Sequence, residues 1–260
     1  MAKHAAEFKL SITKAFSDQL AAAIEALTPV PLTPDAIGSL EAAPGVYQLH
    51  LNRSLVYIGK ADRSLPQRLE RHLRKLSSRS GMDVASVAFT CLYVEEDFSA
   101  VAPERLLISR HKDSGEVPWN YNGFGNNDPG KRRDKTLVEG DHFDRLFPID
   151  LHWTLPDIPQ GPTSLAKLLI WTKKALPYLF RYQDSSSFAD ITLTVPTGAS
   201  DVNQLLTAIS EALPDTWQIT ALHGYVIMYP ERGDYPSALR YYQDGQSLQS
   251  HPGAEHRRLR

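Results

Sequence analysis

Two short apolar strings separated by a turn constrain this chain more than any other feature. Residues 45–47 (Gly-Val-Tyr) and 56–59 (Val-Tyr-Ile-Gly) each suit a β-strand, and turn-forming Asn52 lies between them. The segment therefore predicts a β-hairpin centred on Asn52, with Tyr47 opposite Tyr57. Period-two alternation then places four residues on one face: Tyr47, Leu49, Tyr57 and Gly59. Two phenol hydroxyls should share a small area, although a tyrosine pair buried only for packing would give the same pattern.

A basic helix should follow the hairpin directly. Ser64 suits the N-cap and Pro66 suits the first turn. Leucines at helical spacing predict its buried stripe: Leu65, Leu69, Leu73 and Leu76. Arg68 and His72 are four residues apart and so lie on one face. Residues 60–79 contain seven Lys or Arg against two acids. A solvated basic helix would show the same charge, but this helix leaves from the strand that carries Tyr57.

Three further segments complete the pattern. Residues 84–94 predict a strand and residues 101–111 predict a helix, with Glu104 near its start. An acid at that position also interacts favourably with the helix dipole. The loop of residues 117–130 is rich in Asn, Gly and aromatic side chains and contains Asn120. Long ordered loops of this kind often carry function.

In this order, the motifs resemble those of the GIY-YIG nucleases over residues 44–135. The Arg68/His72 pair, the Glu104 helix and the string Trp-Asn-Tyr-Asn-Gly-Phe-Gly-Asn-Asn at 119–127 look most like the type II restriction endonucleases of that superfamily. The branch in question contains the isoschizomers of SacII, which cut CCGCGG. The first motif has Val46 where the family name has Ile, a conservative change on the other face of the strand.

The resemblance implies roles for individual residues. Tyr47 would be the general base, with Tyr57 and His72 in its hydrogen-bond neighbourhood. Arg68 would grip the phosphate and, with Lys60, lower the phenol pKa. Glu104 would hold one Mg²⁺, for which Mn²⁺ can substitute. Asn120 would orient the scissile phosphate, with Asn122 as the alternative.

A set of basic and amide side chains is expected to contact DNA. The set comprises Lys60, Arg71, Asn122, Asn126, Asn127, Lys131, Arg132 and Arg133. Arg and Lys can donate to guanine, and Asn can face the cytosine amine, as a GC-only target requires. The three consecutive cations at 131–133 would serve equally well as phosphate contacts, and the sequence leaves both roles open.

Composition limits the class of protein. The chain has 28 Lys and Arg against 30 Asp and Glu, so it lacks the overall basic excess of a protein that coats nucleic acid without specificity. Its single cysteine, Cys91, allows neither a disulfide framework nor a zinc ribbon. No apolar run is long enough to cross a membrane and no signal peptide opens the chain, which predicts a cytoplasmic protein without a membrane partner.

The predicted fold class is α+β, a small GIY-YIG-type sheet flanked by helices with a small C-terminal α/β unit. Residues 1–35 should form an amphipathic helix (5–27) and a Pro-rich connector, and residues 36–150 the nuclease domain. Residues 163–243 should form a separate unit for packing or oligomerisation, and residues 244–260 a disordered tail.

The most direct reading is a Mg²⁺-dependent, sequence-specific endonuclease that cuts both strands of DNA. By the resemblance it would act as a homodimer or higher homo-oligomer, with a cognate methyltransferase encoded nearby but not bound. Two alternatives stay open. One is a homing or repair-type nuclease of the same superfamily that nicks DNA, and the other is a non-catalytic DNA-binding protein on a nuclease scaffold.

Overall fold

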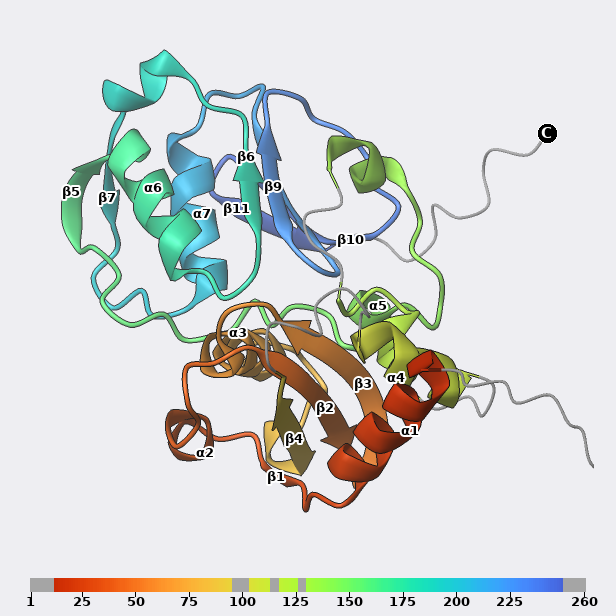
Figure 1. Ribbon diagram of the computed structural model, residues 1–260. Helices are drawn as coiled ribbons and strands as arrows, with labels where there is room; N and C mark the ends of the chain where they lie inside the picture. Colours follow the sequence, from red (N-terminus) through yellow and green to blue (C-terminus); the bar gives the residue numbers. More distant parts are fainter. Residues whose placement is uncertain (1–11, 95–102, 113–116, 126–129, 250–260) are drawn as a thin grey trace, which may run out of the picture. The chain divides into compact units, whose positions relative to one another are not determined.

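The computed structural model describes residues 12–94, 103–112, 117–125 and 130–249, and it confirms the predicted α+β class (Figure 1). The chain divides into two compact units. Unit 1 comprises residues 1–73 and 83–121, and unit 2 comprises residues 74–82 and 122–260. Within the described residues, none of the helices combines the length and the apolar character needed to cross a bilayer.

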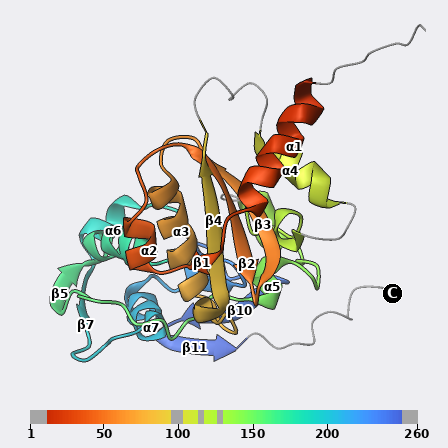
Figure 2. The same cartoon turned by 60° about the horizontal axis from the view of Figure 1, so that its bottom comes forward.

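Unit 1 is built on a four-stranded antiparallel sheet. The strand order is β1 (Val30–Pro31), β4 (Val87–Tyr93), β2 (Gly45–Leu51) and β3 (Ser54–Ala61), so β2 is flanked on both sides (Figure 2). Five consecutive residues of β2 are buried, as expected for a strand covered on both faces. The segment predicted as one strand at 84–94 begins with a 3₁₀ turn at Val84–Ser86, because Asp83 caps the backbone N–H of Ala85.

The hairpin of β2 and β3 forms as predicted, but its register differs. Asn52 and Arg53 both have positive φ, 50° and 69°, and form the two-residue turn typical of hairpins. His50 pairs with Leu55 whereas Leu49 pairs with Tyr57, so one extra residue of β3 forms a β-bulge. The predicted pairing of Tyr47 with Tyr57 is therefore wrong by two residues, and Tyr47 pairs with Gly59. A shift of two keeps both tyrosines on one face.

Helices cover the sheet of unit 1. They are α1 (Ile12–Glu25), α2 (Pro34–Gly38), α3 (Leu65–Ser77) and α4 (Pro103–Lys112). Leu20 and Ile24 of α1 and Leu107 of α4 form one apolar cluster with Val46 and Ile58 of the sheet. The amphipathic N-terminal helix thus belongs to the core of unit 1, although it was predicted as a separate segment. Residues 5–11 of that prediction lie outside the described part of the chain.

Unit 2 contains a five-stranded sheet and a two-stranded one. The larger sheet has the order β11 (Gln246–Gln249), β10 (Ala238–Gln243), β8 (Gln218–Leu222), β9 (Val226–Tyr229) and β6 (Phe180–Tyr182), and β5 (Gly161–Ser164) pairs with β7 (Thr192–Val195). Its helices are α5 (Phe143–Leu146), α6 (Leu165–Ala175) and α7 (Val202–Ala212). A capping box between Asp201 and Gln204 begins α7, and leucines of α6 and α7 join one large apolar core.

The boundary between the units differs from the prediction. It falls between residues 121 and 122 and not near 150. The reason is that residues 122–150 bond to the rest of unit 2: the N–H of Ile149 donates to His223 O, and Arg79 pairs with Asp144. The predicted tail is also wrong at its start, because residues 246–249 form β11 against β10. Residues 250–260 lie outside the described residues.

Candidate active site

The hydroxyl of Tyr47 is the centre of a buried polar cluster in unit 1. Its oxygen lies 2.6 Å from His72 Nε2 and accepts a hydrogen bond of 3.1 Å from Arg68 Nε. Tyr47 is fully buried, and His72 is only 5% exposed. Because Arg68 donates to the phenol oxygen, the phenol can use its own proton to bond a neutral His72 at Nε2. A tyrosine held only for packing would not need two polar partners.

Helix α3 supplies both partners because of its periodicity. Leu65, Leu69 and Leu76 are fully buried, which turns one fixed face of the helix toward the core. Arg68 and His72 are four residues apart on the adjacent face and meet the same hydroxyl. The predicted pairing of these two side chains is therefore present in the structure.

Tyr57 completes an aromatic group around His72. Its ring centroid lies 6.1 Å from that of Tyr47 and 5.6 Å from that of His72. Tyr57 is 5% exposed, so both phenols are removed from water. The structure thus brings together four of the predicted site residues in one small volume.

Sterics explain why both motifs contain a glycine, at positions 45 and 59. A Cβ at Gly59 would overlap the hydroxyl of Tyr47 and lie 2.8 Å from a ring carbon of Tyr57. A Cβ at Gly45 would overlap the backbone carbonyl of Leu92. Neither glycine has a positive φ, so close approach and not backbone conformation excludes a side chain at both positions.

Burial controls the acidity of the phenols. It raises the pKa of Tyr47 well above the ordinary value and also raises that of Tyr57, and the charge of Arg68 opposes the shift in both cases. Both phenols are therefore protonated at neutral pH. Tyr47 can remove a proton from water only if it passes its own proton on, and His72 Nε2 is positioned to receive it.

Glu104 lies in the first turn of α4, as predicted. Burial raises the pKa of its carboxyl, and the positive charges of Arg68 and Lys60 oppose this rise. Its charge also raises the pKa of both tyrosines, which places the carboxylate within electrostatic reach of the cluster.

A single Mg²⁺ fits this donor set. Mg²⁺ is commonly held by one or two carboxylates, with water and phosphate oxygens completing its shell. A half-buried carboxylate beside cationic side chains and phenols offers one hard oxygen ligand of this kind. Within the described ranges, no group of three or more His, Cys, Asp or Glu could enclose a metal on its own.

Asn120 is bonded to a strand edge. The N–H of Ile58 donates to Asn120 Oδ1 at 2.9 Å, and Asn120 Nδ2 donates to Ile58 O at 2.8 Å. The 3₁₀ turn Pro118–Asn120 follows Val117, which is buried in the left-handed region with a φ of 62°. Both ends of the Asn120 amide are thus bonded to β3, and the second N–H of Nδ2 could donate to a phosphate with both of these bonds intact.

The other predicted DNA contacts are distributed over both units. In unit 1, Lys60 pairs with exposed Asp62 at 2.8 Å, and Arg71 is exposed on α3. In unit 2, Asn122 O accepts from Phe143 N, and Lys131 lies 4.4 Å from the ring centre of Tyr229. Arg132 and Arg133 belong to the same 3₁₀ turn, Lys131–Lys135, and are exposed. Asn126 and Asn127 lie outside the described residues.

Comparison with known proteins returned no match. Neither the protein-family models nor the curated proteins contain a sequence that aligns significantly with this chain. The residues of the cluster and their geometry are therefore the guide to function.

Proposed function

We propose that this protein is a Mg²⁺-dependent, sequence-specific DNA endonuclease of the type II restriction class. The observation that carries the proposal is the convergence of Arg68 and His72 on the hydroxyl of Tyr47, with Tyr57 beside them and Glu104 in electrostatic reach. A general base, a cation for a phosphate and a hard metal ligand are the parts that phosphodiester hydrolysis needs.

In the proposed reaction, Tyr47 removes a proton from the attacking water as it gives its own proton to His72. The distance of 2.6 Å between the phenol oxygen and His72 Nε2 supports this transfer. The hydrogen bond from Arg68 stabilises negative charge on the phenol oxygen, and the same guanidinium can neutralise a non-bridging phosphate oxygen. The products would be a 5′-phosphate and a 3′-hydroxyl.

Glu104 would hold the metal ion. When bound, Mg²⁺ (or Mn²⁺ in its place) would neutralise charge that develops on the phosphate and the leaving 3′ oxygen. The positive charges of Arg68 and Lys60 oppose the rise that burial causes in the pKa of Glu104, and so favour the ionised form that can bind a metal.

The proposed substrate is double-stranded DNA, with CCGCGG as the target that the motif resemblance implies. A homodimer would place one nuclease site on each strand of such a palindrome. The cognate methyltransferase would be a separate protein encoded nearby. The proposed location of the nuclease is the cytoplasm, where it would meet its DNA substrate.

Plasmid cleavage with matched variants tests the proposal. The wild type should linearise a plasmid that carries one CCGCGG site when Mg²⁺ is present, and it should fail with EDTA. Glu104→Gln should retain DNA binding but lose cleavage, since affinity comes mainly from phosphate and base contacts. Glu70→Gln makes the same chemical change at an exposed position of α3 and should cleave normally.

Three outcomes would count against it. Mg²⁺-dependent cutting by Glu104→Gln would remove this residue from the site. Release of nicked circles alone by a monomer would favour the nicking nuclease. Specific binding without any cleavage over a range of sequences and metals would favour the non-catalytic DNA-binding protein.

A further inference from the structure

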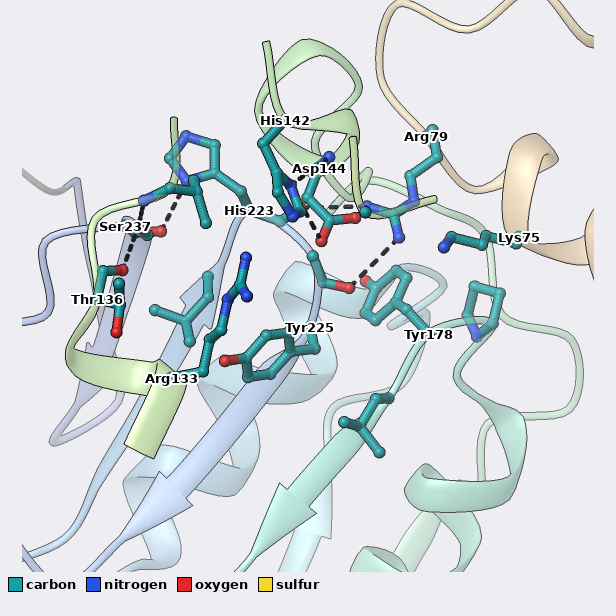
Figure 3. A pocket seen from close by; sticks show the side chains of 16 residues that line it. Lys75, Arg79, Arg133, Thr136, His142, Asp144, Tyr178, His223, Tyr225 and Ser237 are labelled. Carbon is teal, nitrogen blue, oxygen red and sulfur yellow. Dashed lines mark hydrogen bonds and ion pairs between the residues drawn. The ribbon is translucent and has the colours of Figure 1, made fainter. Parts of the chain in front are cut away.

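Unit 2 contains a cavity of about 250 Å³ that the nuclease motifs do not explain (Figure 3). Its volume is close to the lower end of small-molecule sites, about 300 Å³. Residues far apart in the sequence meet here, including Lys75, Arg133, His142 and Tyr225. Every lining residue belongs to unit 2, so the cavity is complete within that unit.

One part of the wall is cationic. Lys75, Arg79 and Arg133 line the cavity together with a single carboxylate, Asp144. Arg79 and Asp144 form an ion pair of 3.0 Å in which the Arg79 side chain is only 3% exposed. With that pair neutral overall, the charges of Lys75 and Arg133 give this wall a positive excess.

His142 stands between those charges and supports the same conclusion. Burial lowers the pKa of this imidazole, and the charges of Arg133 and Lys75 lower it further, against the opposing effect of Asp144. Lys75, Arg133 and His142 all line the same cavity. An anion bound at this position would meet all three side chains.

A buried network anchors the backbone next to Arg133. The neighbouring Asp134 is 1% exposed and accepts hydrogen bonds from Tyr225 at 2.8 Å and from Tyr229 at 3.1 Å, and it pairs with Arg181. This anchor fixes the short 3₁₀ turn Lys131–Lys135, which carries Arg133 at the cavity. The anchor therefore fixes the backbone that carries Arg133, while the Arg133 side chain itself is exposed.

The rest of the lining is largely apolar. Pro177, Leu179, Leu222 and the rings of Tyr178 and Tyr225 line it. Figure 3 shows Arg133 rising beside Tyr225, with His142 and Asp144 across the cavity from Tyr225. A ligand that fits this lining has an anionic group and a flat, weakly polar body.

We propose that this cavity binds a nucleotide, with its phosphate at Lys75, Arg133 and His142 and its base against the apolar wall. Phosphate suits Arg and Lys donors, and a base packs on aromatic and aliphatic side chains. The nucleotide can be a free mononucleotide or part of a DNA strand, since both offer this chemistry. The proposal does not depend on the nuclease activity of unit 1.

Calorimetric titration of the full-length protein in EDTA, which prevents cleavage, tests the proposal. The probes are the four 2′-deoxynucleoside 5′-monophosphates, the matching deoxynucleosides and inorganic phosphate. At least one monophosphate should bind about tenfold more tightly than its nucleoside and than phosphate alone. Arg133→Gln should weaken that binding about tenfold, whereas the neighbouring Arg132→Gln, which does not line the cavity, should change it less than twofold.

Each outcome has a definite meaning. Displacement of the monophosphate by an oligonucleotide duplex without the target site would identify DNA as the source of the nucleotide, and failure to displace it would identify a free nucleotide. Lys75→Gln provides a second variant if Arg133→Gln melts early. Equal binding of phosphate and monophosphate, equal effects of Arg132→Gln and Arg133→Gln, or no binding at millimolar concentration would overturn the proposal. Loss of cleavage in Glu104→Gln bears only on the nuclease.

Discussion

The hydroxyl of Tyr47 lies over the backbone of Gly59, its direct partner across the β2–β3 pair. A methyl group at position 59 would occupy the place of the phenol oxygen. Gly59→Ala should therefore displace Tyr47, abolish cleavage and cost about 1–3 kcal/mol of stability through overpacking. Gly38→Ala is the matched control, because a Cβ at Gly38 meets no atom within 4 Å. Cleavage and thermal melting of both variants measure the effect, and a fully active Gly59→Ala would contradict it.

Tyr47→Phe separates phenol chemistry from ring packing. The ring stays buried and only the hydroxyl bonded to His72 and Arg68 is lost. We expect cleavage to fall by about 10²–10⁴-fold, the range for general acid–base catalysis, with little change in melting temperature. Tyr93→Phe, on β4 of the same sheet, removes a hydroxyl bonded to the Glu41 N–H and should stay active. Wild-type rates in Tyr47→Phe would show that the hydroxyl has only a packing role.

Asn120→Ala should reduce stability as well as activity. It leaves the N–H and the carbonyl of Ile58 without the amide that bonds both, which costs about 1–3 kcal/mol. Asn120→Asp keeps an acceptor for the N–H but loses the donor, so its stability should be intermediate. Denaturant unfolding of the three proteins checks this order. Cleavage by folded Asn120→Asp, assayed well below its melting temperature, then reports on the phosphate-orienting role separately.

Stability should decline below about pH 6.5, the ordinary pKa of histidine. Burial lowers the pKa of His223, His142 and His50 in the folded protein. The unfolded chain then binds more protons in this range, so the stability present above pH 6.5 is lost as the pH falls toward the folded-state values. Denaturant unfolding at pH 7.5 and 5.5 measures the decline.

His223→Gln identifies one source of that decline. In the folded protein His223 Nδ1 is hydrogen-bonded to the carbonyl of Ser237 at 2.8 Å. Its pKa is also affected by the charges of Arg145, Asp144 and His142. The variant should show a smaller loss between pH 7.5 and 5.5 than the wild type. An unchanged loss would mean that His223 titrates alike in the folded and unfolded states.

The sequence predicted the parts of the candidate site that depend on local pattern. Leucine spacing determined which face of α3 is buried, and this placed Arg68 and His72 together. Pro103, which suits a first helical turn, placed Glu104 in the first turn of α4. The hairpin itself followed from two apolar strings around a turn.

Long-range packing could not be predicted in the same way. The register of the hairpin depends on a β-bulge that no single residue of the sequence predicts. The boundary between the units depends on where residues 122–150 pack. The prolines between positions 148 and 162, which suggested a boundary near 150, mark only a break in local structure. The cavity of unit 2 joins Lys75 to Tyr225 across 150 positions of the chain, and no spacing rule links such residues. Buried Asp134 likewise sits in a run of five charged residues that suggests only a solvated surface.

The bulge in β3 determines whether Tyr47 and Tyr57 lie on the same face of the sheet. The turn at Asn52 and Arg53 alone would set Tyr47 opposite Ile58 and send Tyr57 to the other side of the sheet. The one extra residue, Val56, shifts the pairing by one, so that Tyr47 lies opposite Gly59 and both phenols project from the same face of the sheet. A related chain could therefore lengthen or shorten this hairpin by two residues and keep its tyrosines together. A change of one residue would separate them unless a bulge were gained or lost at the same time.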